Sequence, residues 1–227
     1  MPSLQIPQEE QKWQLETLAV LWDLAATNPE SSIKRIQLHD VHDFTSLGDI
    51  WYAAQMPGFR VLRADECPEG VVGVGMSYET VVMDPGILLT WLRRRLEASG
   101  VVFKRVELAA LEDAREVVDC DVLVNATGAG PLLLEDVRDA EVKRVRGQTL
   151  LVRNSCDRAF IRQGRDYTYA IPRLDGSVII GGIRQEGVAD TEVDMELARD
   201  VSAAGLWTGL NGSFTDSAIT DCAPCER

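Results

Sequence analysis

Residues 121–130, with the sequence DVLVNATGAG, constrain the fold of this chain more than any other stretch. A short apolar run containing the β-branched residues Val122 and Val124 ends in a polar turn with two glycines. A buried parallel strand that delivers its carboxyl end to a ligand has this pattern. Glycine has no Cβ, so the backbone of such a turn can come close to a bound molecule. The stretch therefore predicts a strand over residues 121–125 followed by a ligand-lining turn.

The residues before this stretch predict the helices and strand of a parallel sheet with crossover connections. Asp84 is a suitable N-cap, and the proline after it fits the first turn of a helix over residues 85–98. The apolar stripe of this helix consists of Ile87, Leu88, Trp91, Leu92 and Leu96. A strand over residues 101–106 and a short helix over residues 109–117 follow. Helices and strands that alternate at short spacing are typical of a parallel sheet.

A second group of expected strands has no long helices between its members. These strands cover residues 147–153, 168–173 and 177–184, and the last two are joined by the tight connection Leu-Asp-Gly at residues 174–176. Such a short connection predicts a hairpin. A helix over residues 9–27 precedes everything else. The expected fold class is α/β, with a nucleotide-binding layer interleaved with an antiparallel sheet.

Composition excludes several classes of protein. The formal net charge of the 227 residues is -13, which argues against binding to nucleic acid or to an anionic membrane surface. Five scattered cysteines indicate a reducing compartment rather than a disulfide framework. No segment approaches the roughly 20 apolar residues of a membrane span, and we see no secretory signal at residues 1–11. We expect an intracellular protein.

Three short motifs suggest chemistry, and we give each a simpler interpretation. His39, Asp40, His42 and Asp43 could bind a metal, but their spacing is not fixed by a helix, so we expect a solvated loop. The glycines of residues 70–75 have the wrong spacing for a phosphate loop and predict a glycine-containing strand or turn. Cys222 and Cys225 have the spacing of a redox dithiol. Because they lie in the weakly patterned residues 201–227, we interpret that stretch as a loose tail.

The order of the apolar and glycine-containing motifs resembles the FAD-dependent D-amino-acid oxidase family, which includes D-aspartate oxidase. The resemblance covers about residues 13–192, and only the whole series in order is specific. The motifs that carry it are Trp91-Leu92 in a helix that ends at Gly100-Val101, residues 103–106 (FKRV), 122–128 (VLVNATG), 146–148 (RGQ), 169–173 (YAIPR) and 179–182 (IIGG).

This resemblance implies FAD as cofactor and oxidative deamination of D-amino acids as the reaction. The α-hydrogen leaves as hydride to the flavin, the imine hydrolyses to a 2-oxo acid, and oxygen reoxidises the flavin to give hydrogen peroxide. By residue-to-residue match, Val106 would lie near the adenine through its backbone, and Thr127 and Gly128 would line the cofactor. Tyr169 would help to hold the substrate carboxylate or close the site. Residues 146–148 would be architectural, and the partner would be a small molecule rather than a nucleic acid or a membrane.

The resemblance also predicts how the chain is divided. Residues 1–83 and 153–200 would belong to the substrate domain, residues 84–152 to an incomplete Rossmann-like FAD-binding layer, and residues 201–227 to the tail. The family's Gly-x-Gly-x-x-Gly turn and its Gly-x-Arg-Pro arginine segment are not found in this sequence. We therefore expect a shortened form, or a form whose remaining parts come from another chain. The location would be cytoplasmic or peroxisomal.

Two alternatives stay open. One is a catalytically silent relic or binding module of the same family. The other is a related glycine or sarcosine-type amine oxidase.

Overall fold

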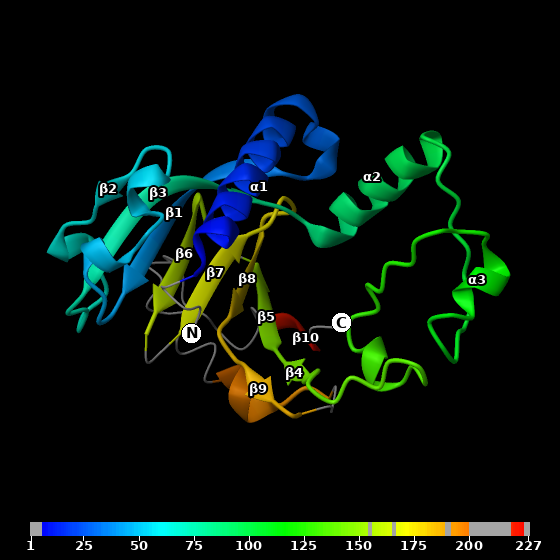
Figure 1. Cartoon of the computed structure of the whole chain (residues 1–227). Coiled ribbons are helices and arrows are strands. Elements are labelled where there is room, and N and C mark those ends of the chain that lie inside the picture. The colour runs from blue at the N-terminus through cyan, green and yellow to red at the C-terminus, as the bar shows by residue number, and fades with distance from the viewer. Residues whose placement is uncertain (1–5, 154–155, 165–166, 189–191, 200–218, 225–227) are drawn as a thin grey trace.

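A single mixed sheet organises most of the chain (Figure 1). The computed structural model describes residues 6–153, 156–164, 167–188, 192–199 and 219–224. The sheet has eight strands in the order β10-β5-β8-β7-β6-β1-β3-β2. Their bounds are β1 Lys34–His42, β2 Arg60–Val61, β3 Val74–Val82, β5 Gln148–Arg153, β6 Arg158–Gln163, β7 Thr168–Pro172, β8 Ser177–Gly181 and β10 Ile219–Pro224. Two short strands, β4 Val145–Arg146 and β9 Gln185–Glu186, pair separately.

The sheet is assembled from two distant parts of the sequence. β1, β2 and β3 come from the first part and form antiparallel pairs, as do β5, β6, β7, β8 and β10 from the last part. The two parts meet where β1 pairs with β6 in parallel, with Gln37 opposite Arg158 and His42 opposite Gln163. Among the described strands this parallel pair is the junction of the whole sheet. The mixed sheet confirms the α/β class.

Each face of the sheet carries its own core, because side chains alternate along a strand. On one face, Phe160, Ala170, Ile180 and Leu150 lie opposite one another across four neighbouring strands. On the other face, a second row runs from Met76 through Asp40, Ile161 and Tyr169 to Gly181. Met76 is fully buried, and Ile161 packs against the same cluster. Across these four strands the first row is apolar, and it continues to His39 of β1 and Ser77 of β3, whereas the second row carries Asp40 and Tyr169.

The expected hairpin is confirmed. β7 and β8 pair antiparallel, and the Arg173 N–H donates to the Ser177 carbonyl at 2.8 Å. Asp175 accepts hydrogen bonds from the Ser177 backbone N–H and hydroxyl. Gly176 has φ +80°, a conformation that side chains other than glycine's rarely adopt. The local sequence Leu-Asp-Gly thus sets the turn.

Two long helices match their predicted ranges. α1 covers Gln8–Thr27 and lies against β3 and β1. α2 covers Pro85–Ala98, and the Asp84 carboxylate caps it by accepting from the N–H groups of Gly86 and Ile87 at 3.0 and 3.3 Å. The Ser32 hydroxyl donates to the Asp84 carbonyl, and Arg173 pairs with the Asp84 carboxylate. Asp84 therefore fixes the start of α2 to the end of the sheet.

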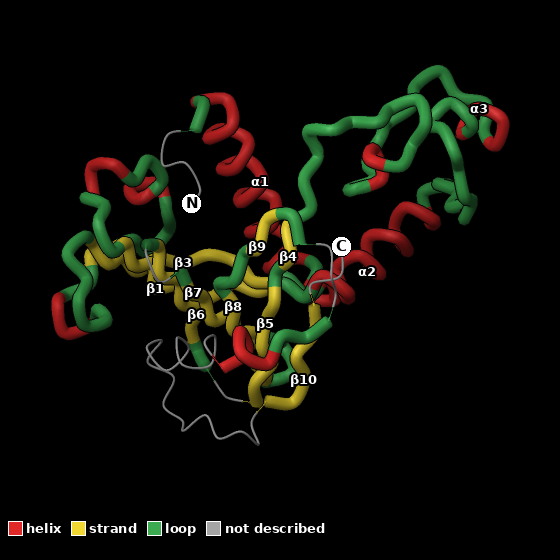
Figure 2. Tube along the Cα trace, turned by 90° about the horizontal axis from the view of Figure 1, so that it is seen from below, coloured by secondary structure: helices red, strands yellow, loops and turns green. Residues whose placement is uncertain are grey.

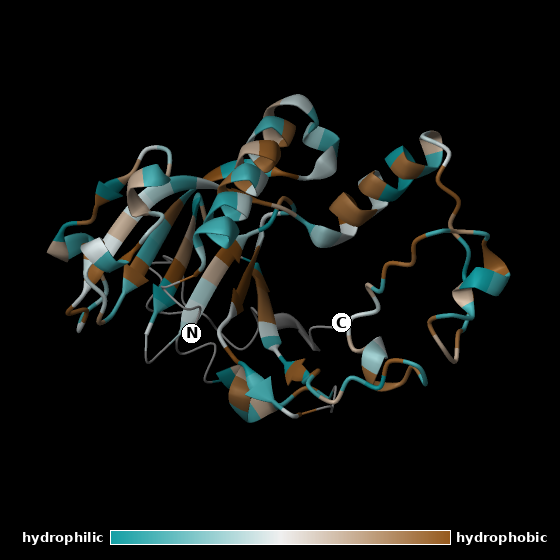
Figure 3. Ribbon diagram, viewed as in Figure 1, coloured by the Kyte–Doolittle hydropathy of each residue, from teal (hydrophilic) through white to brown (hydrophobic). Residues whose placement is uncertain are grey.

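Residues 84–144, which we call the side layer, project away from the sheet, as Figures 1 and 2 both show. The side layer contains α2, the short helix α3 Ala114–Val117 and long irregular connections. Leu134 is its one buried residue, and Figure 3 shows apolar residues spread along its exposed ribbon. In the predicted strands, Val102, Val122 and Val124 are 76%, 74% and 81% exposed.

The predictions of strands over residues 101–106 and 121–125 are wrong for this chain. Both stretches are irregular, and across the described residues no backbone hydrogen bond involves positions 102–107 or 121–126. A strand forms only when a neighbour satisfies its N–H and C=O groups. Since the structure shows no such neighbour, the apolar sequences remain in contact with solvent.

The prediction of a loose tail is wrong for residues 219–224. They form β10, which pairs antiparallel with β5. The reason is that β5 would otherwise present an unpaired edge, and such an edge is a template for another strand. Residues 201–218 and 225–227, including Cys225, lie outside the described part of the chain.

Candidate functional site

The turn after the predicted 121–125 strand is held by its own side chains and glycines. The Asn125 side-chain carbonyl accepts from the Thr127 N–H at 3.2 Å and from its hydroxyl at 2.8 Å. The Gly130 N–H then donates to the Thr127 carbonyl at 2.9 Å. Gly128 has φ +61°, and a Cβ on Gly130 would lie 2.6 Å from the Thr127 Cβ. The glycines are thus required by the turn, which leaves Thr127 and Gly128 exposed.

Val106 lies on the other irregular stretch of the side layer and is half exposed. Val106, Thr127 and Gly128 all belong to the side layer, whereas Tyr169 belongs to β7 of the large sheet. The side layer stands apart from the sheet in both views (Figures 1 and 2). The predicted cofactor-side and substrate-side residues thus form two separate groups in this structure.

Tyr169 is held on the sheet by the strand next to it. It lies directly opposite Gly181 of β8, and its ring leans across this strand. The ring of Tyr167 meets that of Tyr169 edge to face, with centroids 6.1 Å apart and planes at 62°. Tyr169 is half-buried, so its ring is ordered by neighbours while remaining partly accessible.

A buried polar network occupies the same face of the sheet as Tyr169. The Asp40 carboxylate, 2% exposed, accepts hydrogen bonds from the hydroxyls of Tyr52 at 2.7 Å and Tyr78 at 2.9 Å. His42 Nε2 lies 3.2 Å from the other carboxylate oxygen of Asp40. Burial, and then the negative charge of Asp40, raise the pKa of both tyrosines well above the ordinary range. Two strand spacings, about 10 Å, separate Asp40 from Tyr169.

This network corrects the expectation of a solvated loop at residues 39–43. His39, Asp40 and His42 lie in β1, and Asp43 directly after it is buried and paired with Arg162 at 2.8 Å. Charged groups are tolerated in a core when each has a partner. Sequence reasoning missed this because the partners Tyr52, Tyr78 and Arg162 come from distant segments. The described residues contain no group of three or more His, Cys, Asp or Glu placed to hold a metal.

Arg146 and Gln148 make structural contacts with residues 192–194. Gln148 is buried, and its side-chain carbonyl accepts from the Asp194 N–H at 2.9 Å while its amide donates to the Asp194 carbonyl at 2.7 Å. Arg146 donates to the Gln148 side chain at 3.2 Å and to the Glu192 carbonyl. Ala198, a few residues on, is buried in the apolar core. Residues 146–148 therefore fasten the 192–199 segment over one face of the sheet.

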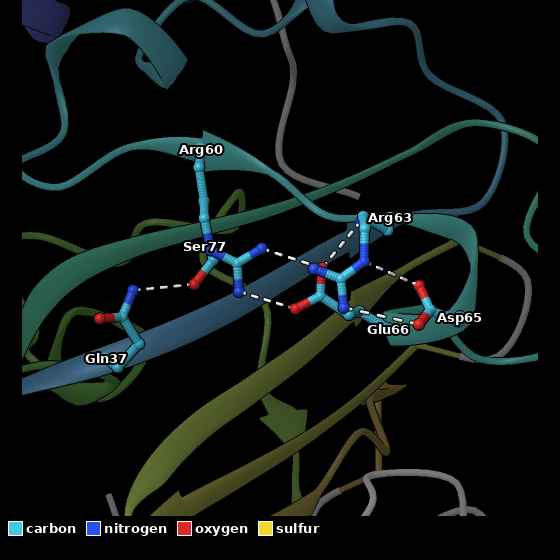
Figure 4. A network of polar contacts seen from close by, with 6 residues as sticks. All are labelled: Gln37, Arg60, Arg63, Asp65, Glu66 and Ser77. Carbon is cyan, nitrogen blue, oxygen red and sulfur yellow. Dashed lines mark hydrogen bonds and ion pairs between the residues drawn. The ribbon is translucent and has the colours of Figure 1, made fainter.

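An exposed ionic network fixes the edge of the sheet at β2 (Figure 4). The Arg60 guanidinium forms two hydrogen bonds to the Glu66 carboxylate, at 2.8 and 2.9 Å. Together with the Arg63 N–H, these bonds lower the pKa of Glu66 to about 2. Nearby in β1, burial lowers the pKa of His39, and the charges of Arg158 and Arg60 act in the same direction. These contacts are architectural.

The glycines of residues 70–75 form a turn and the start of β3, as expected. Gly70 has φ +83°, and β3 begins at Val74. A Cβ on Gly73 would lie 2.8 Å from the Thr45 N atom, so glycine is needed for close approach of two backbone segments. A role for these glycines in phosphate binding is not needed to explain them.

The sheet and side layer define a mixed α/β protein, and the sequence comparisons identify its family. The sequence matches the family described as FAD dependent oxidoreductase over residues 2–214, and the chain belongs to this family. It is 34% identical to the D-amino-acid oxidase of Streptomyces coelicolor over 194 residues, which cover 83% of this chain and 57% of that protein. It is 30% identical to the D-aspartate oxidase of Talaromyces thermophilus over 203 residues, covering 83% of this chain and 52% of the relative.

Solved structures show the same fold. The chain resembles the glycine oxidase of Geobacillus kaustophilus with a TM-score of 0.65 at 14% identity, covering 98% of this chain and 68% of that structure. It resembles the L-proline dehydrogenase of P. horikoshii with a TM-score of 0.64 at 12% identity, covering 93% of this chain and 64% of the other. The chain thus spans about half the length of the curated relatives it matches.

No helix in the described ranges is both long and apolar enough to cross a membrane.

Proposed function

We propose that this chain takes part in the FAD-dependent oxidative deamination of a D-amino acid, with Tyr169 contacting the substrate carboxylate. The observation that carries the proposal is the position of Tyr169. Its ring is fixed on the sheet by β8, and its hydroxyl is a donor of the kind that binds carboxylates. Membership of the family and similarity to a D-amino-acid oxidase and a D-aspartate oxidase support this substrate class.

The residues of the side layer fit the cofactor in part. The exposed turn at Thr127 and Gly128 allows a ligand to approach the backbone closely, and half-exposed Val106 offers an apolar contact. FAD supplies the acceptor for the hydride when it is bound. Val106, Thr127 and Gly128 would hold and orient it. The start of α2, the long helix of the side layer, is already occupied by the Asp84 carboxylate, so we do not assign the diphosphate to it.

The division of labour along the chain is part of this proposal. Residues 84–147, containing the side layer, would contribute to the cofactor-binding part. Residues 1–83 and 153–200 would contribute to the substrate-binding part. Because β5 belongs to the large sheet, we place Gln148–Arg153 with the substrate-binding part rather than at the end of the cofactor-binding part.

The test combines cofactor binding with turnover. We expect FAD to raise the unfolding temperature, because a ligand that binds only the native state adds stability, about 2.7 kcal/mol at a hundredfold excess over Kd. In the presence of FAD, D-alanine or D-aspartate should produce hydrogen peroxide, and the L-enantiomers should not. Tyr169→Phe should raise KM, whereas Tyr167→Phe, which removes a neighbouring hydroxyl, is the matched control.

A protein that unfolds at the same temperature with and without FAD would contradict the proposal and favour a silent relic or a binding module. The exposed apolar residues of the side layer support that alternative. Peroxide formation from glycine or sarcosine, but not from D-alanine, would instead favour a glycine oxidase. The fold similarity to such an enzyme supports this second candidate.

A further inference from the structure

Gly181 is a glycine in the middle of a packed sheet, and its backbone does not explain why it is there. It ends β8, lies buried opposite Tyr169, and is absent from the glycines with positive φ. Any residue could adopt its extended conformation, and glycine weakens the interior of a strand. Gly182, the next residue, is different. It has φ +150°, and a Cβ there would lie 3.0 Å from the Tyr167 carbonyl carbon.

The reason for glycine at position 181 is the ring of Tyr169. A Cβ on Gly181 would overlap Cζ and the hydroxyl oxygen of Tyr169 and would lie 2.9 Å from Cε1. The end of the ring that carries the hydroxyl therefore rests above the bare backbone of β8, rather than above its own strand. The ring of Tyr167 also contacts the Tyr169 ring, edge to face.

We propose that Gly181 is a positioning residue, whose missing side chain sets the place of the Tyr169 hydroxyl over β8 and thereby the place of the substrate carboxylate. This inference rests on the proposed function, which assigns Tyr169 to the carboxylate. Any side chain at position 181 lifts the ring and moves the donor, and a hydrogen bond weakens steeply when its geometry is lost. A substrate whose acid group binds above β8 then loses its contact.

The experiment measures the ¹⁹F chemical shift of the tyrosine itself rather than the rate of turnover. The chain has four tyrosines, so 3-fluorotyrosine labelling gives four ¹⁹F resonances, each assigned by its Tyr→Phe variant. Gly181→Ala should move the Tyr169 resonance and leave those of Tyr52 and Tyr78 in place. Gly48→Ala is the control, because a Cβ on Gly48 meets nothing within 4 Å. An unmoved Tyr169 resonance in Gly181→Ala refutes the positioning role alone.

Ligand titrations separate this inference from the function on which it rests. With reduced FAD present and oxygen excluded, so that the substrate is not consumed, D-alanine or D-aspartate should shift the Tyr169 resonance of the unsubstituted protein, and Gly181→Ala should raise the fitted Kd about tenfold or more. In a Tyr169→Phe background the same substitution should change Kd less than twofold, because the hydroxyl is already gone. Equal losses in both backgrounds refute the positioning role. If D-amino acids do not change the chemical shift of Tyr169 in the unsubstituted protein, the substrate role of Tyr169 is refuted, and the positioning role of Gly181 with it.

A second variant covers the case in which Gly181→Ala unfolds the protein. Adding Tyr169→Ala removes the ring with which the new methyl group overlaps. The double variant should then recover the unfolding temperature of Tyr169→Ala alone. Failure to recover it would show that glycine is needed at position 181 for a reason other than the ring, and would overturn the proposal.

Discussion

Removing the Tyr78 hydroxyl should destabilise the fold more than removing any other tyrosine hydroxyl. Tyr78 is buried, and its hydroxyl donates to the Asp40 carboxylate at 2.9 Å. A hydrogen bond to a charged group contributes about 1.5–3 kcal/mol, and its loss leaves a buried carboxylate with one donor fewer. For a chain of this length each kcal/mol corresponds to about 2–4 °C, so Tyr78→Phe should lower the unfolding temperature by roughly 3–12 °C.

Urea unfolding at pH 7, followed by tryptophan fluorescence, measures the free energy directly. Tyr167→Phe is the matched control, since Tyr167 is 43% exposed and its substitution should change stability by less than about 0.5 kcal/mol. Tyr52→Phe removes the other donor to the same carboxylate oxygen. Because both hydroxyls share this acceptor, the two losses should differ from additivity by about 0.5 kcal/mol or more. If Tyr78→Phe costs no more than Tyr167→Phe, the account of the buried network is wrong.

Three further outcomes follow from the contacts described above. The raised pKa of Tyr52 and Tyr78 means that the native state keeps their protons, so their contribution to stability is full below about pH 10 and falls as the pH rises further. In the double Phe variant the free energy of unfolding should therefore depend less on pH above about pH 10. The lowered pKa of His39 has the opposite sign, so stability should fall as the pH drops below about 6.5, and His39→Gln should remove this part of the slope. Gln148→Ala leaves the Asp194 N–H and C=O without their partner and should cost about 1–3 kcal/mol in urea unfolding, whereas a loss under 0.5 kcal/mol would contradict the fastening role.

Local sequence was sufficient to predict the position of an element whose hydrogen-bond partners lie close to it in the chain. The Asp84 cap with the proline after it located α2, and the Leu-Asp-Gly turn located the β7–β8 hairpin. In both cases the hydrogen-bond partners lie within a few residues of one another. The glycines of residues 70–75 were likewise explained by their spacing.

Elements that depend on distant partners could not be located in this way. The apolar residues 101–106 and 121–125 have the composition of strands, but a strand also needs a neighbour, and composition cannot reveal that the described part of the chain provides none. The residues around Asp40 appeared solvated for the same reason, because their partners Tyr52, Tyr78 and Arg162 come from three other segments. The leaning of the Tyr169 ring onto Gly181 depends on strand register, which the sequence does not state.

The pairing of β1 with β6 has a consequence for how the molecule responds to proteolytic cleavage. The strands on its two sides belong to segments separated in sequence by the whole side layer, yet they share backbone hydrogen bonds and both apolar cores. A protease that cuts the exposed 101–126 region would break the polypeptide without breaking a backbone hydrogen bond between β1 and β6. The resulting pieces would remain associated as a two-part complex, so a cut or an insertion in this region should leave the large sheet intact while it disturbs the residues that we assign to FAD.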